Sequence, residues 1–112
     1  RGAAPGQHPS VKRTFTFEEA RKLVPAVRER TRRAIARIEE LGADAEAPAT
    51  PEARGILLAW AREMDELGIE VKGPWLVDFD SGDGYWCWRW PEESLDWFHG
   101  YDEGFAGRVR VQ

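Results

Sequence analysis

The sequence predicts an α+β fold in a single domain: a kinked antiparallel helical hairpin packed on a small antiparallel β-hairpin, then a short C-terminal helix and a Gly-rich loop. Two long segments have apolar residues at helical spacing, and each begins at a threonine suited to cap a helix. The apolar period then changes to two on both sides of a Gly-rich turn. The length of 112 residues fits one domain. We therefore expect a disordered tail at 1–13 and one folded domain at 14–112.

The first helix is predicted to begin at Phe17 and to end near Gly42. Thr16 and Glu19 form a capping box, in which each side chain bonds the backbone amide of the other residue. The apolar positions step alternately by four and three residues: Ala20, Val24, Val27, Thr31, Ala34, Ile38 and Leu41. Pro25 lies inside this pattern and predicts a kink, because it lacks an N–H and crowds the preceding turn.

A second helix is predicted between Thr50 and Gly68. Thr50 is suited to the N-cap and Pro51 to the first helical position. The linker at 43–50 is short, so the two helices should lie antiparallel. The heptad pattern of the first helix offers more apolar surface than one short partner helix needs. We therefore predict a homodimer through the helical hairpin.

The segment from Trp75 to Trp90 predicts a β-hairpin. Apolar and polar residues alternate on both sides of the turn at Ser81–Gly84. With an even loop length, one apolar face carries the pairs Phe79/Trp86, Val77/Trp88 and Trp75/Trp90, and should pack on the helices. The opposite face carries the pairs Asp80/Tyr85, Asp78/Cys87 and Leu76/Arg89.

After the hairpin, Pro91 is expected to open a short helix with Glu92 in its first turn. The glycines of Gly104–Arg108 then indicate a loop. Since two strands alone are marginally stable, an extra strand from 69–72 or 108–111 is expected.

Composition narrows the function classes. The net charge is −4, with ten Lys or Arg against three Glu in 1–37 and a strongly acidic remainder. Because acidic surface repels phosphates, we expect no nucleic-acid partner, and we interpret the basic segment as a solvated helix face. No apolar run approaches the ~20 residues of a membrane span, so no membrane partner is expected. A single cysteine cannot form an internal disulfide, which fits a cytoplasmic location.

Several motifs between residues 15 and 108 resemble the small bacterial proteins known as domain of unknown function 2203. The matching pieces are Phe15-Thr16-x-Glu18-Glu19-Ala20, Leu23-x-Pro25, Gly68-x-Glu70-Val71-Lys72, Leu76-Val77-Asp78-Phe79, Cys87-Trp88-Arg89, Glu92, His99 and Asp102-x-Gly104-Phe105-Ala106-Gly107-Arg108. The last two, read together, form the most specific motif. The resemblance implies no activity, because none is established for the family.

The chain departs from the family's usual pattern at three places. Trp75 stands where the family usually has Gly, and Asp80 where it usually has Pro. The sequence Phe98-His99-Gly100 replaces the usual Trp-His-Glu. If that Glu has a chemical role in the family, Asp102 or Glu103 would have to supply it in this chain.

The candidate site lies in the C-terminal motif. His99, Asp102 and Arg108 are candidate catalytic residues: the imidazole as an acid or base, and the guanidinium as a clamp for a small anionic ligand. The candidate ligand-binding residues are aromatic, because aromatic side chains can form a stacking wall: Trp88, Trp97 and Phe105.

The same segment is also a candidate metal site. Its donors are one imidazole and three carboxylates: His99, Asp78, Glu92 and Asp102. A set of this kind, with Cys87 across the hairpin, can bind a divalent metal such as Zn, Fe or Mn. Glu92 and His99 are seven residues apart, so they would share a face if the helix after Pro91 is continuous.

Two functions remain open on the sequence alone. The first is a metal- or small-ligand-binding protein, or an enzyme, that uses this site. The second is a non-enzymatic dimerisation or interaction module in which Arg108 is paired with Asp102 or Asp78 and the motif is structural. His99 and Arg108 discriminate between the two: convergence on an open pocket favours the first, and burial among satisfied partners favours the second.

Overall fold

The computed structural model describes residues 13–111 and has the predicted α+β fold. Its elements are α1 (Phe17–Glu40), α2 (Pro51–Glu66), β1 (Glu70–Gly73), β2 (Leu76–Asp80), β3 (Tyr85–Arg89), β4 (Trp97–His99), the 3-10 helix η1 (Phe105–Gly107) and β5 (Val109–Arg110). Each strand pairs antiparallel with the next, so the order in the sheet is the order in the chain. Except for Arg13, the tail predicted at 1–13 lies outside the described residues.

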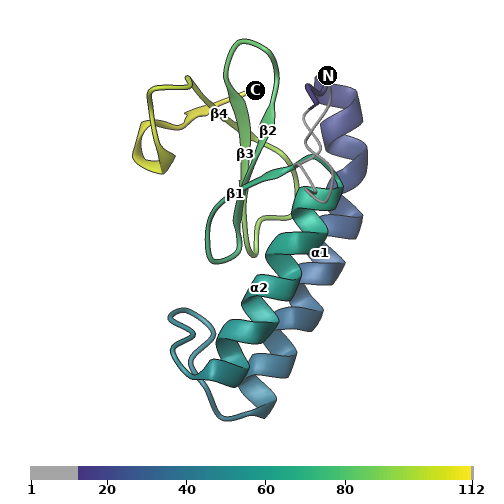
Figure 1. The fold of residues 1–112 in the computed structure, drawn as a ribbon. Coiled ribbons are helices and arrows are strands. Elements are labelled where there is room, and N and C mark those ends of the chain that lie inside the picture. Colours follow the sequence, from purple (N-terminus) through teal and green to yellow (C-terminus); the bar gives the residue numbers. More distant parts are fainter. Residues whose placement is uncertain (1–12, 112) are drawn as a thin grey trace, which may run out of the picture.

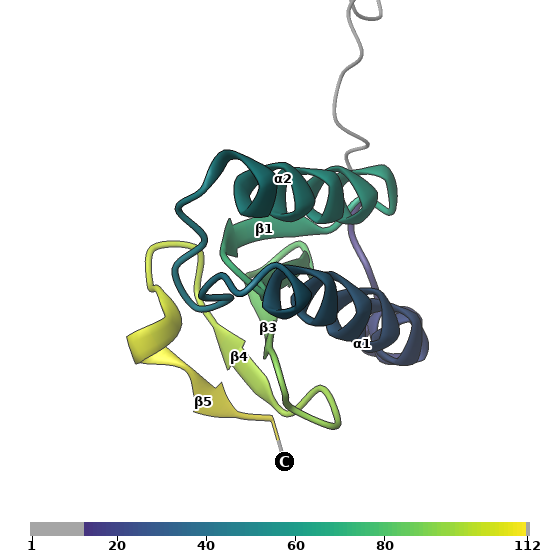
Figure 2. The ribbon, with the colours of Figure 1, turned by 90° about the horizontal axis from the view of Figure 1, so that it is seen from below.

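The molecule has two layers (Figure 1). The helical hairpin lies against one face of the sheet, and the far ends of both helices extend past the strands with the loop that joins them. Strand β1 lies next to α2, and β5 forms the other edge of the sheet (Figure 2). One face of every central strand is therefore turned toward the helices, and the other is turned away from them.

The predicted capping of α1 is confirmed, and its predicted seam is buried as far as Ile38. The Thr16 hydroxyl accepts from the Glu19 amide at 3.1 Å, and the Glu19 carboxylate accepts from the Thr16 amide at 2.9 Å. The buried residues of the helix are the predicted ones, together with Ile35: Ala20, Val24, Val27, Thr31, Ala34, Ile35 and Ile38. Gly42 follows the helix with a φ of 76°. Leu41, the last position of the predicted seam, is 53 % exposed because it is the C-cap. Pro25 lies within α1, and its kink stays a prediction.

Helix α2 begins as predicted, with the Thr50 hydroxyl accepting from the Ala53 amide at 3.1 Å and Pro51 at the first position. It packs on α1 through a mixed contact. The indole N–H of Trp60 donates to the hydroxyl of Thr31 at 2.9 Å, and both side chains are buried. The one polar position of the α1 seam is thus satisfied by a tryptophan of α2.

The β2–β3 hairpin has the predicted register. Phe79 faces Trp86, Val77 faces Trp88 and Asp78 faces Cys87. Ser81 closes the four-residue turn, since its amide donates to the Gly84 carbonyl at 2.8 Å. The apolar side of the hairpin packs into the core with the helices. The fully or nearly buried members of that core are Phe15, Ala20, Val24, Val27, Ala34, Ile35, Ile38, Ala45, Ala53, Trp60, Met64, Ile69, Trp75, Val77, Phe79, Trp88 and Leu95.

The helix predicted after Pro91 does not form there. Residues Trp97–His99 are strand β4, which pairs with β3, and the short helix of this region is η1, further along the chain. The helical interpretation was wrong because β3 offers a free edge whose backbone groups need partners. The shared helical face expected for Glu92 and His99 is therefore absent.

Both predicted extra strands are present, as β1 and β5. Between β1 and β2, Trp75 adopts a left-handed backbone with a φ of 61°, which costs a non-glycine residue about 1–2 kcal/mol. The Trp75 side chain offsets this strain, since it is 3 % exposed and its indole N–H donates to the Ala45 carbonyl at 2.7 Å. The conformation explains why glycine would suit this position.

Among residues 13–111, no helix is both long enough and apolar enough to cross a membrane.

Candidate functional site

The outer face of the sheet, meaning the face turned away from the helices, carries a group of polar side chains. Along β2 and β3 the residues alternate, so Val77 and Trp88 enter the core while Asp78 and Cys87 lie on the outer face. The pairing of β4 with β3 sets His99 opposite Tyr85, on the same side. Three neighbouring strands thus supply one polar residue each.

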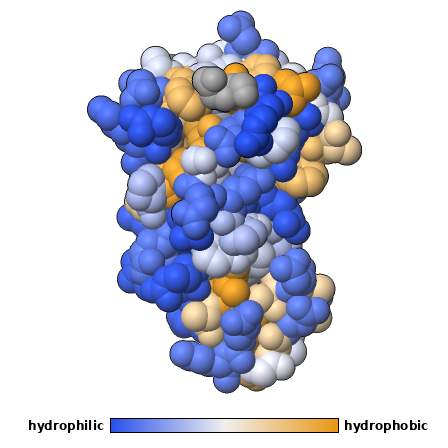
Figure 3. Space-filling view, turned by 180° about the vertical axis from the view of Figure 1, so that it is seen from behind, coloured by the Kyte–Doolittle hydropathy of each residue, from blue (hydrophilic) through white to orange (hydrophobic). Residues whose placement is uncertain are grey.

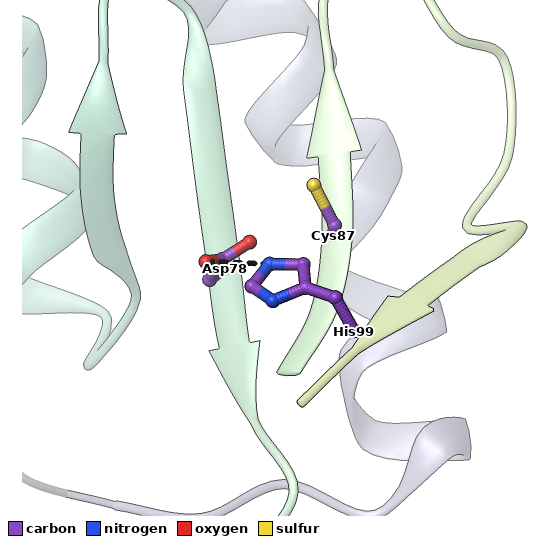
Figure 4. A group of neighbouring side chains, drawn as sticks. All are labelled: Asp78, Cys87 and His99. Atoms are coloured by element: carbon purple, nitrogen blue, oxygen red, sulfur yellow. Dashed lines mark hydrogen bonds and ion pairs between the residues drawn. The ribbon is translucent and has the colours of Figure 1, made fainter. Parts of the chain in front are cut away.

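Asp78, Cys87 and His99 form the cluster drawn in Figure 4. One potential ligand atom of each residue lies within 4.8 Å of the other two. His99 Nε2 is 3.0 Å from Asp78 Oδ2. The residues are 2 %, 1 % and 3 % exposed, respectively. An imidazole, a thiol and a carboxylate are therefore held together out of water by paired strands.

Each ring nitrogen of His99 has one polar contact, and together the two contacts orient the imidazole ring. Nδ1 is 2.9 Å from the carbonyl oxygen of Gly100. A carbonyl only accepts, so Nδ1 carries a hydrogen. Nε2 faces a carboxylate oxygen of Asp78 at 3.0 Å, on the side where a metal ligated by Nε2 would stand.

The Cys87 thiol is not poised for nucleophilic attack. Burial raises the pKa of this thiol to about 12, and the charge of Asp78 is the second largest cause of the increase. Arg108 acts in the opposite direction, with Nη1 3.9 Å from the sulfur, but it does not outweigh burial. Because the thiolate is the reactive form, a neutral buried thiol is inert at physiological pH. Cys87 can become a ligand only by releasing its proton.

Lys72 is the residue that sequence reasoning missed. Its ammonium lies 3.0 Å from Asp78 Oδ2, 3.6 Å from Glu70 Oε1 and 3.8 Å from the centroid of the Tyr85 ring. Burial acts to lower the pKa of Lys72, but the hydrogen bond and charge of Asp78 outweigh it, so the pKa is raised. The alternation of Glu70 and Lys72 in the sequence was the signal that both belong to the outer face.

Arg108 returns over the sheet beside the cluster. It pairs with Glu92 at 2.9 Å, with side chains 12 % and 23 % exposed, rather than with Asp102 or Asp78. Its guanidinium also lies 4.6 Å from the centroid of the Trp97 indole and 4.1 Å from that of the Phe105 ring. Arg108 is thus enclosed between two aromatic side chains and one carboxylate.

The structure brings only some of the predicted site residues together. Asp78 and His99 are in direct contact, and Arg108, Trp97 and Phe105 lie beside each other. Asp102 lies in an exposed turn, and its side chain makes no hydrogen bond or ion pair within residues 13–111.

Two further predicted residues lie apart from the cluster. Trp88 is fully buried on the helix side of the sheet, and its indole N–H donates to the backbone carbonyl of Glu92 at 2.9 Å. The carboxylate of Glu92 accepts from Arg108 and from the Arg89 amide. Glu92 therefore borders the cluster through Arg108.

The donor set suits a divalent transition metal. Zinc and iron accept imidazole, thiolate and carboxylate ligands, and bonds of ~2.0–2.3 Å set tetrahedral ligands roughly 3.5 Å apart. The 4.8 Å span of the cluster needs a contraction of about 1 Å to reach this geometry. Asp78 Oδ1 is buried and, among the described residues, has no hydrogen-bond partner. The Cys87 thiol lies near this carboxylate, which raises the pKa of the thiol. Asp78 Oδ1 is therefore available as a ligand.

Lys72 and Arg108 oppose a metal ion by charge. The Lys72 side chain is 36 % exposed and stands at the sheet edge, so its ammonium can withdraw toward Glu70 and solvent. Arg108 is already neutralised by Glu92. The net electrostatic cost to an incoming cation therefore depends mainly on Lys72.

A family model described as "Uncharacterized conserved protein (DUF2203)" matches residues 13–111 of the chain. No curated protein and no solved structure matches it.

Proposed function

The chain belongs to the DUF2203 family, and we propose that it binds one divalent transition-metal ion at the Asp78–Cys87–His99 cluster. The observation that carries the proposal is the convergence of a carboxylate, a thiol and an imidazole from three paired strands within 4.8 Å. Thiolate is a soft ligand, so zinc and iron rank before manganese.

Two details of the cluster support a metal over a purely structural hydrogen bond. The Nδ1–H of His99 is directed at a backbone carbonyl, which is the usual second contact of a metal-ligating histidine and leaves Nε2 to bind. Asp78 has a buried carboxylate oxygen without a partner among the described residues, which would cost free energy unless another group satisfied it.

The proposal explains Lys72 as a counter-charge. In the metal-free protein its ammonium compensates the buried carboxylate of Asp78 at 3.0 Å. Metal binding would replace this cation and release the thiol proton of Cys87. Arg108, 3.9 Å from the sulfur, would then stabilise the thiolate. The catalytic roles of His99, Asp102 and Arg108 stay predictions from the sequence.

The test begins with metal analysis of purified, untagged protein, followed by titration of the chelator-treated protein with Co²⁺. We expect saturable binding with the near-ultraviolet band of a thiolate ligand. Cys87→Ser should abolish the band, and Asp78→Asn should weaken binding by about tenfold or more. Asp83→Asn is the matched control, because this exposed carboxylate of the same hairpin makes no side-chain hydrogen bond or ion pair within residues 13–111, and the variant should bind metal like the parent. Equal binding by the parent, Cys87→Ser and Asp78→Asn would refute the proposal.

The second candidate function is the interaction module, and one observation favours it. His99 is buried and Arg108 is half-buried, and within residues 13–111 the polar groups of both have partners. In that case the polar contacts of the outer face serve only to stabilise the sheet. Asp78→Asn and His99→Ala would then lower the melting temperature, and Co²⁺ would raise it for neither the parent nor the variants.

The homodimer belongs to this second candidate as a proposal. The sheet and α2 cover the α1 seam, so a dimer through the hairpin would use the exposed leucines near its far end, Leu41 and Leu58, which are 53 % and 64 % exposed. Light scattering that gives a concentration-independent mass of 12.8 kDa would refute it. A reducing location such as the cytoplasm suits a free Cys87.

A further inference from the structure

A groove of about 450 Å³ runs between the two helices, and its lining includes no residue of the Asp78–Cys87–His99 cluster. Arg30, Arg33 and Arg37 line it from α1, at spacings of three and four residues that place them on one side of the helix. The hollow exists because small side chains face it from both helices, namely Ala34 and Ala59. The groove is thus lined by long cationic arginine side chains and by small alanine side chains that leave its centre open.

The arginines of the groove differ from the other arginines of α1. Arg21 makes two hydrogen bonds to Glu18, at 2.7 and 3.2 Å, and this contact lowers the pKa of Glu18. Arg32 makes two hydrogen bonds to Glu29, at 2.6 and 3.0 Å, which lower the pKa of Glu29 in the same way. Both of these guanidinium groups, which lie outside the groove, are therefore neutralised by a carboxylate one turn earlier.

In the groove the ion pairs are long or absent. Arg30 reaches Glu63 only at 4.0 Å, and Arg33 reaches Glu29 at 3.6 Å although Arg32 already occupies that carboxylate. Arg37 takes part in no ion pair within residues 13–111. The three guanidinium groups therefore keep N–H donors free toward the groove, and Glu63 is its only acidic lining residue among those described.

We propose that this groove, called here the arginine groove, binds the phosphate group of a small phosphate ester. Guanidinium forks match the oxygens of phosphate and bind them in pairs. The volume is that of a site for a small ligand, and the lining adds apolar surface, mainly from Ile56 because Trp60 is 2 % exposed. The apolar lining is limited to four residues, Ala34, Ile56, Ala59 and Trp60, so an ester with one compact apolar group fits better than an extended chain. Seen from behind, the surface of the molecule is mainly hydrophilic with small apolar patches (Figure 3).

The test is calorimetric titration of the full, chelator-treated protein with inorganic phosphate and with phenyl phosphate, at constant ionic strength. Removal of metal prevents phosphate from binding through the Asp78–Cys87–His99 cluster, so this result does not depend on the metal proposal. The groove variant is Arg33→Gln/Arg37→Gln. The matched control is Arg21→Gln/Lys22→Gln, which removes the same charge from the same helix outside the groove and leaves the Arg32–Glu29 pair intact.

We expect saturable binding that is tighter for phenyl phosphate than for phosphate. The groove variant should weaken it by about tenfold or more, and the control by less than about twofold because only the general field changes. Equal weakening in both variants would show a nonspecific charge effect and overturn the proposal. Absence of saturation in the parent would overturn it as well. So would a groove variant that changes the mass by light scattering and leaves phosphate binding intact, since the groove would then be a subunit contact.

Discussion

Replacement of Arg108 with alanine in the metal-free protein is expected to lower the free energy of unfolding by about 3 kcal/mol. The pair with Glu92 is 2.9 Å long, and its side chains are only 12 % and 23 % exposed. Loss of Arg108 leaves the half-buried carboxylate of Glu92 without its counter-charge, which costs about 1–3 kcal/mol. The contacts of the guanidinium with Trp97 and Phe105 add roughly 0.5–1 kcal/mol each.

Arg110→Ala is the matched control for this substitution. Arg110 is exposed, lies 5.1 Å from the Trp97 ring, and makes no ion pair within residues 13–111. Its loss should cost about 0.5 kcal/mol. Arg108→Lys keeps the charge but lacks the planar fork, so an intermediate loss of about 1–2 kcal/mol is expected.

Urea unfolding with a chelator present, followed by tryptophan fluorescence, measures all three variants. For a domain of this size, the Arg108→Ala loss corresponds to a fall in melting temperature of roughly 10–20 °C. If Arg108→Ala and Arg110→Ala unfold at the same urea concentration, the enclosed pair does not hold the C-terminal loop, and the energetic reasoning is wrong.

Four further substitutions or conditions test other parts of the structure. Gly84→Ala should cost at least about 2 kcal/mol in a thermal melt, because an added Cβ would lie 2.7 Å from the backbone oxygen of His99. Thr31→Val removes the acceptor of the buried Trp60 indole N–H and should cost about 1–3 kcal/mol; a loss below about 0.5 kcal/mol would mean that the N–H finds another acceptor. Without metal, Cys87 should react with a thiol reagent at pH 8 far more slowly than it does in denaturant, because its folded pKa is raised to about 12. Metal affinity should rise about tenfold per pH unit between roughly pH 6 and 8, since Cys87 must lose its proton to bind, and a pH-independent dissociation constant would exclude a thiolate ligand.

The sequence predicts best where a local pattern and a turn act together. The β2–β3 register follows from the period-two alternation and the four-residue turn, because a shift by one residue would move Val77 and Trp88 out of the core. The same logic places Asp78 beside Cys87. Strand β4 was not predicted, since Trp97–His99 is only three residues long and its pairing with β3 is a tertiary contact.

The candidate site was only partly predicted, because it also depends on tertiary contacts between strands. His99 reaches Asp78 through the β3–β4 pairing, which no sequence spacing reveals. Asp102 was chosen because it is near His99 in the sequence, yet the chain turns away after β4 and leaves it exposed. Lys72 comes from the other edge of the sheet, where an irregular register in β1 precedes the turn. Distances across a sheet depend on the order of its strands, and the residue pattern of a single sequence does not reveal that order.

The strand order also sets when the cluster can exist during synthesis. Asp78 and Cys87 leave the ribosome first and can pair within the β2–β3 hairpin, whereas His99 arrives with β4. A nascent chain that ends before β4 would present an acid and a thiol on an unfinished sheet. A metal ion that requires all three residues would bind only the completed sheet, and at a concentration 100 times its dissociation constant it would favour that state by about 2.7 kcal/mol. Metal supply would then influence how much of the newly made chain keeps β4 in place.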